Sequence, residues 1–407
     1  MTKTEIVRAA FKVWGRSLYQ NTSLSHLARE LKVSKPALYR HFLSKQVLMD
    51  AMAAHFFDDF VGFIRADYER ALQSKDWNEG ISTIFRSTAE YYARNADALI
   101  FSLMNVHGRN TEDFNPAELL KNRGVDLGMF QHAVKEEYTR DPLLLQLAFA
   151  TLIFFMAYFH KTAKRSGASP SEEEIQKIIA LVSEIIMSGL GHSGVALDRL
   201  NYEELESRVA GAVQNVESDP LLRAVAKAVA EAGPWKASMN MVARRSGLSK
   251  SSLYGHFKNK QDMLRQLFIT EFVRIIAFAR QGIALSAVPQ EQFYLGIFSI
   301  AVYLRSRPEI LVAIDWIRTR RLDLGRHGKK QPDFFRVFKD VDIGTLPGGE
   351  YPEGEEGKWQ ASHWILFLLV SILMRPGGGL SLRNVQNSDI RTLVRFAAMG
   401  IKGFKKC

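Results

Sequence analysis

The chain has 407 residues, of which 47% are hydrophobic, and a formal net charge of +11. This length predicts about two to four domains with sizeable cores. The single cysteine, Cys407, excludes a disulfide framework and a cysteine-based metal site. That cysteine usage is typical of the reducing cytoplasm. The first residues run directly into a helical pattern without the apolar core of a signal peptide, so we expect a cytoplasmic protein.

Helical periodicity dominates the sequence, and no stretch alternates in the manner of a strand. The first expected helix spans residues 3–18. Its apolar face is formed by Ile6, Val7, Ala10, Phe11, Trp14 and Leu18. Ser23 can cap a second helix, whose apolar stripe is Leu24, Leu27, Ala28 and Leu31. After a tight turn, Ser34 can cap a third, short helix that carries Pro36 in its first turn. Ser44 can cap the long helix that follows.

The segment around this third helix occurs twice. Ser34 to Phe42 returns as Ser249 to Phe257, an offset of 215 residues. The two stretches align without a gap from Ser23 to Gln46, and about half of the paired residues are identical. Solenoid repeats are much shorter, with periods of roughly 20–50 residues. The repeat therefore predicts two copies of one unit joined in a single chain.

The positive charge is concentrated in the repeated segments. Residues 1–50 and residues 219–265 each hold nine Lys or Arg and three Asp or Glu, which gives +6 in each. The remainder of the chain is therefore close to neutral. A basic patch confined to small modules is typical of nucleic-acid binding, although a solvated basic surface is the simpler alternative for either segment alone.

The repeat divides the chain into five expected parts. They are a helix-turn-helix domain at 1–48, a helical regulatory domain at 49–195, a linker helix at 196–218, a second helix-turn-helix domain at 219–263 and a second regulatory domain at 264–407. Late apolar helices are expected at 143–159, 172–187, 364–374 and 390–401. We expect a break at Gly233-Pro234 and a surface loop at Gly344 to Gly357. Residues 143–159 are at the short limit for a membrane span, and a buried bundle helix is the favoured interpretation.

A tight turn between the second and third of three helices is the helix-turn-helix arrangement, in which the third helix enters the major groove of DNA. Small and long polar residues at its leading end can meet base edges, and Tyr, His and Lys can reach phosphates. Lys45 and Lys260 begin the next helix, where free N–H groups also favour a phosphate. The predicted DNA-binding residues are Ser34, Lys35, Pro36, Ala37, Tyr39, Arg40, His41, Lys45, Ser249, Lys250, Ser251, Ser252, Tyr254, His256 and Lys260.

This pattern resembles the tetracycline-repressor (TetR/AcrR) family of transcription regulators over about 45 residues in each half. The motifs are Leu27-Ala28, Val33-Ser34-Lys35, Leu38-Tyr39-Arg40-His41-Phe42 and Ser44-Lys45, with their counterparts around Leu253-Tyr254 and His256-Phe257. The resemblance implies an all-α fold. It also implies an N-terminal DNA-binding domain and a C-terminal domain that binds a small hydrophobic ligand and dimerises through a four-helix bundle. The C-terminal domain carries no sequence motif of its own.

The fusion of two units departs from the family plan and suggests a monomeric chain that forms an internal pseudo-dimer. The copies differ where bases would be read, since Pro36, Ala37 and Arg40 become Ser251, Ser252 and Gly255. Glycine inside a helix costs about 1 kcal/mol relative to Ala, which weakens the second recognition helix. We therefore expect an asymmetric operator, with the first half-site contributing more affinity.

Alternatives remain for several residues. Tyr39 and Tyr254 can be core aromatics, and His41 and His256 can be structural helix ends. Candidate residues for a ligand pocket are Phe101, Phe130, Phe154 and Tyr158, and bundle core is the alternative for them. We expect no metal and no cofactor. No nucleophile elbow, metal-ligand set or phosphate loop suggests an enzyme. A scaffold protein whose helix-turn-helix units no longer bind DNA is the main rival to a regulator.

Overall fold

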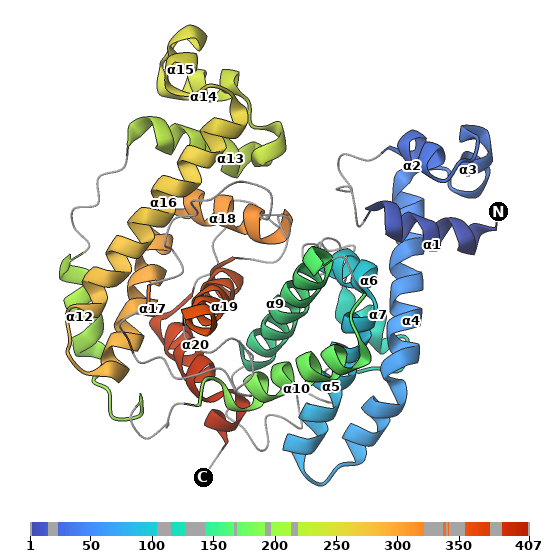
Figure 1. Ribbon diagram of the computed structural model, residues 1–407, viewed down its shortest axis with the longest axis horizontal. Coiled ribbons are helices and arrows are strands. Elements are labelled where there is room, and N and C mark those ends of the chain that lie inside the picture. The colour runs from blue at the N-terminus through green and yellow to red at the C-terminus, as the bar shows by residue number, and fades with distance from the viewer. Residues whose placement is uncertain are drawn as a thin grey trace. The chain divides into compact units, whose positions relative to one another are not determined.

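The computed structural model describes residues 2–14, 23–103, 115–126, 128, 143–166, 169–191, 197–212, 219–320, 337–338, 341, 355–374 and 385–405. Their regular elements are all helices, which confirms the predicted all-α fold (Figure 1). The chain forms two compact units. The first comprises Met1–Arg140 and Phe155–Ser183, and the second comprises Asp141–Phe154 and Glu184–Cys407.

The first unit begins with a three-helix head at the N-terminal end of a long helix (Figure 1). The head consists of α1 (Lys3–Trp14), α2 (Leu24–Glu30) and α3 (Lys35–His41), and the long helix is α4 (Lys45–Gln73). The expected apolar face of α1 forms as predicted, because Ile6, Val7 and Ala10 are buried. The expected continuation to Leu18 lies outside the described residues.

Beyond the head, aromatic side chains fill the core of the first unit. The helices are α5 (Trp77–Arg94), α6 (Ala96–Phe101), α7 (Pro116–Lys121) and the adjoining parts of α9 (Leu143–Ser166) and α10 (Glu172–Ser188). Phe56 and Phe101 pack with ring centroids 5.5 Å apart, and Phe101 lies 4.8 Å from Phe11 of α1. The head and the helical body therefore share one aromatic cluster.

The second unit repeats this plan. Its head consists of α13 (Pro220–Lys236), α14 (Met239–Ser246) and α15 (Lys250–His256), followed by the long helix α16 (Lys260–Ile283). The predicted break at Gly233 is a kink, since Gly233 has φ 73° and the helix resumes as far as Lys236. The body contains α17 (Pro289–Ser306), α18 (Pro308–Arg320), α19 (Glu355–Leu373), α20 (Asn387–Met399) and a 3-10 turn at Ile401–Phe404.

Each body contains a tyrosine that donates to a carboxylate of the long helix. Tyr91 donates to Asp59 over 2.9 Å in the first copy, and Tyr303 donates to Glu271 over 2.6 Å in the second. Burial, together with the neighbouring carboxylate, raises the pKa of both phenols. Glu271 is buried and also accepts from Arg274 over 2.9 Å. A buried charge is tolerated where it is paired and hydrogen-bonded in this way.

The second unit includes the first part of α9, which packs on α19. Trp364 donates its indole N–H to Thr151 over 2.9 Å, and Gln146 donates to the carbonyl of Ser371 over 2.9 Å. Phe154 also faces Phe367, with ring centroids 5.5 Å apart. A late helix of the first sequence copy and a late helix of the second copy thus share one core.

The ends of α10 and α20 cross through two glycines. A Cβ atom at Gly189 would lie 2.5 Å from the nitrogen of Met399, and one at Gly400 would touch the carbonyl carbon of Met187. Both glycines have φ 61°, a conformation that L side chains rarely adopt. Each glycine lies against the helix end that carries the other, so the crossing is reciprocal, as in an isologous interface.

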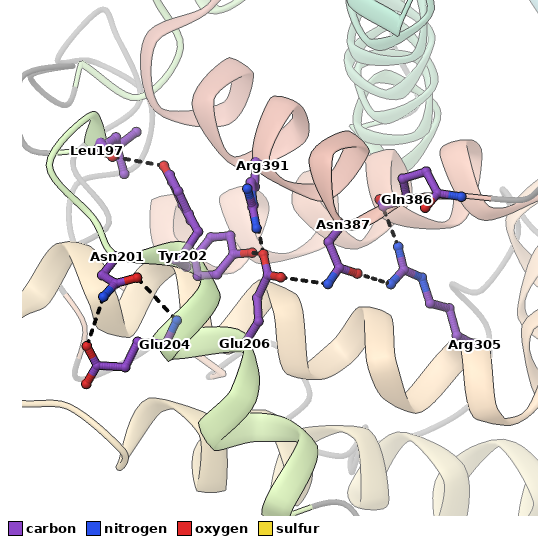
Figure 2. A network of polar contacts seen from close by, with 10 residues as sticks. Leu197, Asn201, Tyr202, Glu204, Glu206, Arg305, Gln386, Asn387 and Arg391 are labelled. Carbon is purple, nitrogen blue, oxygen red and sulfur yellow. Dashed lines mark hydrogen bonds and ion pairs between the residues drawn. The ribbon is translucent and has the colours of Figure 1, made fainter.

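The linker helix, α12 (Tyr202–Ala212), packs on α17 and α16. Figure 2 shows Glu206 of this helix at the centre of a polar network with two residues of α20. Glu206 accepts from Arg391 over 2.8 Å and from Asn387 over 2.6 Å. It also accepts from Tyr294 of α17 over 2.6 Å. The linker is therefore held on the second body by specific polar contacts.

Among the described residues, Leu143–Ala163 of α9 is the one helix long and apolar enough to cross a membrane by length and composition. Most of it is buried, as in the core helix of a folded domain.

The predicted loop at Gly344 to Gly357 is partly wrong, because α19 already begins at Glu355. Residues 344–354 lie outside the described part of the chain.

Candidate nucleic-acid interface

Serine caps build the first head as the sequence predicts. Ser23 accepts from the N–H of His26 over 3.1 Å, and Ser34 accepts from the N–H of Ala37 over 3.3 Å. Ser44 caps α4 by accepting from Val47 over 3.2 Å. Each cap satisfies one of the free N–H groups at a helix start and typically stabilises it by about 1 kcal/mol. These caps fix the orientation of α3 between its neighbours.

The second head has the same construction. Ser238 and Ser249 cap α14 and α15, and Asn259 replaces serine as the cap of α16. The turn before each recognition helix contains a residue in the left-handed region. This residue is Lys32, with φ 55°, in the first head and Gly247, with φ 69°, in the second. The same turn is therefore less strained in the second head, because glycine carries no Cβ.

Two apolar residues anchor each recognition helix. Leu38 and Phe42 are fully buried in the first head, and Leu253 and Phe257 are buried in the second. Because this pair lies on the inner side, the remaining residues of α3 and α15 are presented outward, apart from the half-buried Ala37. Figure 1 shows α3 and α15 lying at the periphery of their own heads.

Most of the predicted DNA-binding side chains are exposed. Tyr39 is 44% exposed and Tyr254 is 48% exposed, so the alternative of core aromatics is wrong for both. His41 and His256 are exposed too. The other exposed predicted residues are Ser34, Lys35, Pro36, Arg40, Ser249, Lys250, Ser251 and Ser252. Ala37, Lys45 and Lys260 are half-buried.

The serines at the start of α15 bond to one another. The Ser249 hydroxyl lies 2.8 Å from that of Ser251 and 2.9 Å from that of Ser252, and it also accepts from the N–H of Ser252. These hydroxyls are expected to read base edges, yet in this structure they form hydrogen bonds with one another and with a free N–H group at the start of α15. The first head has Pro36 and Ala37 at the matched positions, where such a cluster cannot form.

The lysines that begin the long helices follow the recognition helices closely. Lys45 starts α4 and Lys260 starts α16, each directly after the capping residue. Partial burial lowers the pKa of Lys260. A helix start with free N–H groups and an ammonium favours a phosphate, so both lysines lie in suitable places for this contact.

The corner between recognition helix and long helix was not singled out from the sequence. Leu43 is 83% exposed and Val47 is 40% exposed in the first head. The matched residues in the second head are Lys258 and Asp262, and Asp262 accepts from the Lys258 N–H over 3.0 Å. The signal was present in the alignment of the two copies, as an apolar residue paired with a charged one beside the recognition helix.

The candidate pocket residues occupy different places. Phe101 is buried in the aromatic cluster of the first unit, and Phe154 packs on Phe367 in the second unit. Tyr158 lies on α9 and is half-buried, and Phe130 lies outside the described residues. Within the described part of the chain, no group of three or more His, Cys, Asp or Glu residues could hold a metal ion.

Two basic, serine-capped heads with outward recognition helices define a helix-turn-helix DNA-binding protein. The family model for bacterial regulatory proteins of the tetR family matches residues 6–52 and 221–267. The chain carries the DNA-binding domain of this family twice. It is therefore a DNA-binding transcription regulator.

A similar solved structure is the crystal structure of the TetR family transcriptional regulator PfmR from Thermus thermophilus. It shares 19% sequence identity over 44% of this chain and 81% of its own length, with a TM-score of 0.24. The family assignment rests on the two matches of the family model and not on this likeness.

Proposed function

We propose that the chain is a ligand-responsive repressor that acts on two half-sites of one operator as a single-chain pseudo-dimer. The observation that carries this proposal is the reciprocal crossing of Gly189 and Gly400 at the ends of α10 and α20. In a homodimer each subunit would contribute one such helix end. Here both ends come from one chain, and the contacts of α9 with α19 extend the same core.

The exposed residues of α3 and α15 are the proposed DNA contacts, with Lys45 and Lys260 as phosphate anchors. Arg40 adds a cation to α3 that Gly255 lacks in α15. Since DNA is the partner, we place the protein in the cytoplasm. A small hydrophobic ligand bound in a helical body would favour one of two states of the protein and thereby change its affinity for DNA. The domain limits given above, from 1–48 to 264–407, remain part of this proposal.

Two measurements test the proposal. Light scattering of the purified chain should give one chain mass at the concentrations that bind DNA. A stable species of twice that mass, which dissociates only on unfolding, would contradict the internal pseudo-dimer. Selection from random duplexes should give two half-sites of unequal sequence, and mutation of the first half-site should cost more affinity. Perfect palindromes with equal losses in both halves would contradict the asymmetry.

The rival function is a scaffold protein without DNA binding. It predicts weak binding with little salt dependence. A regulator with several phosphate contacts loses affinity steeply as salt rises, with a slope of about −0.9 per contact on a logarithmic plot. A titration of binding against salt concentration therefore separates the two functions directly.

A further inference from the structure

The two heads carry the same net charge but distribute it differently. Segments 1–50 and 219–265 each have nine Lys or Arg against three Asp or Glu. The recognition helix of the first head contains two of its cations, Lys35 and Arg40, whereas that of the second contains only Lys250. The charge missing from α15 reappears a few residues later, at the corner where the long helix starts.

This corner is strongly basic in the second head. Residues 258–265 contain three cations, Lys258, Lys260 and Arg265, and one carboxylate, Asp262. Lys258 is exposed and Arg265 is 66% exposed. Asp262 accepts from the backbone N–H of Lys258 over 3.0 Å and pairs with the Arg265 guanidinium over 3.2 Å. The carboxylate therefore fixes the backbone at Lys258 and the side chain of Arg265 beside the helix start.

The matched corner of the first head is apolar. Residues 43–50 contain one cation and one carboxylate. Of the eight large hydrophobic residues that are exposed in the described structure, Leu43 and Val47 lie in this corner and Tyr39 lies four positions before Leu43, whereas the second head has only Tyr254 among them. A cluster of this kind beside a recognition helix differs from the isolated exposed apolar residues that are common on protein surfaces.

DNA offers different partners to these two corners. Phosphates carry no sequence information and bind cations in a salt-dependent manner. The apolar group that base edges present in the major groove is the methyl group of thymine. A corner with three cations therefore suits phosphates, and an exposed leucine two residues after the end of the recognition helix suits a thymine methyl. The mutual bonding of Ser249, Ser251 and Ser252 also reduces the base-reading capacity of the second head.

We infer that the two heads divide the work of DNA binding. The first head reads sequence, with Leu43 contacting a thymine methyl. The second head supplies salt-dependent and sequence-neutral affinity through the basic corner of Lys258, Lys260 and Arg265. This inference rests on the proposed function, because it assumes that both heads engage one duplex.

The experiment uses the full chain and two fluorescent duplexes, the selected operator and one of random sequence. Binding is measured by anisotropy between about 50 and 200 mM salt. Lys258→Leu, which installs the residue of the first head, should reduce the salt slope by about one and leave the ratio of operator to random affinity unchanged. Leu43→Ala should leave the slope unchanged and reduce that ratio roughly fivefold or more. Both side chains are exposed, and thermal unfolding followed by circular dichroism checks that each variant folds.

Deoxyuridine provides the sharper test, because it lacks the methyl group of thymine and keeps its hydrogen-bonding groups. Each thymine of the first half-site is replaced in turn, and the loss of binding affinity is measured for the wild type and for Leu43→Ala. One thymine should show a loss in the wild type that disappears in the variant. Equal losses in both proteins at every thymine would overturn the reading role of Leu43.

Separate outcomes concern the second head and the proposed function. An unchanged salt slope in Lys258→Leu, or a changed sequence preference, would overturn the phosphate role of the basic corner. A wild-type chain that binds neither duplex in a salt-dependent manner would overturn the proposed function itself. If the wild type prefers the operator but the affinity losses from Leu43→Ala and from replacing each thymine are additive, this inference is overturned and the proposed function is not.

Discussion

The indole N–H of Trp364 donates to the hydroxyl of Thr151 over 2.9 Å, and both side chains are completely buried. The bond joins α9 to α19. Thr151→Val keeps the shape of the side chain but leaves the indole N–H without this acceptor. A buried unsatisfied donor costs about 1–3 kcal/mol, so we expect a loss of this size in chemical denaturation. Thr162→Val is the control, because Thr162 bonds within its own helix and is half-buried.

Glycine at the crossing of α10 and α20 should be irreplaceable. Gly189→Ala adds a Cβ 2.5 Å from the backbone nitrogen of Met399, which cannot move as a flexible side chain can. We expect the free energy of unfolding to fall by at least about 2 kcal/mol, of which the left-handed backbone accounts for about 1 kcal/mol. Gly191→Ala is the matched control. Gly191 has φ 79° and no atom within 4 Å of an added Cβ, so it should show the backbone cost alone. Equal losses at both positions would contradict the tight crossing.

The network around Glu206 should make the second body sensitive to acid (Figure 2). Burial favours the neutral carboxyl, but hydrogen bonds from Arg391, Tyr294 and Asn387 outweigh it and lower the pKa of Glu206. A carboxylate with a lowered folded-state pKa stabilises the fold above its unfolded pKa, and this stability is lost as the pH falls through the folded value. The window therefore lies below the ordinary pKa of 4.5.

Glu206→Gln should lower the unfolding midpoint at pH 7 and flatten its dependence on pH in the acid range. The expected cost is roughly 1–3 kcal/mol, the worth of a hydrogen bond to a charged group. Glu203→Gln, an exposed change on the same helix, should have little effect. A pH profile that is the same in the wild type and in Glu206→Gln would show that the network does not titrate in this window.

Lys32 and Gly247 occupy the same turn in the two heads with positive φ. Lys32→Gly should therefore stabilise the first head by about 0.5–1 kcal/mol, and Gly247→Lys should destabilise the second head by about 1 kcal/mol. Hydrogen exchange of α3 and α15 measures each head separately. The prediction fails if both substitutions shift exchange in the same direction.

Lys45→Ala should weaken binding to all duplexes similarly and reduce the salt slope by about one. Lys260→Ala should behave in the same way, and the pair provides an internal comparison between the heads. A change in the selected sequence with an unchanged slope would contradict the phosphate role of either lysine.

The sequence predicted the heads well because their signals are local. A serine three residues before the N–H group that it caps, and apolar residues four apart, determine the helix starts and the inner face without distant partners. The aromatic alternative for Tyr39 could not be excluded from the sequence, since exposure depends on neighbouring helices. The Glu206 network was also beyond reach, because its members lie on three helices separated by up to 185 residues. The hydrogen bond between Ser251 and Ser249 was not predicted. A serine hydroxyl two residues from a helix cap can bond either to the cap or to a base edge, and the sequence does not distinguish the two.

The pairing of α9 with α19 also has a consequence for synthesis on the ribosome. Thr151 and Trp364 are 213 residues apart, and the first part of α9 belongs to the second compact unit. At an elongation rate of about 5–20 residues per second, roughly 10–40 s pass before its partner emerges. During that time a long apolar helix lacks its final neighbour. A helix whose partner is made by a separate chain can pack as soon as that chain is present, whereas the apolar face of α9 stays uncovered here until α19 has been synthesised.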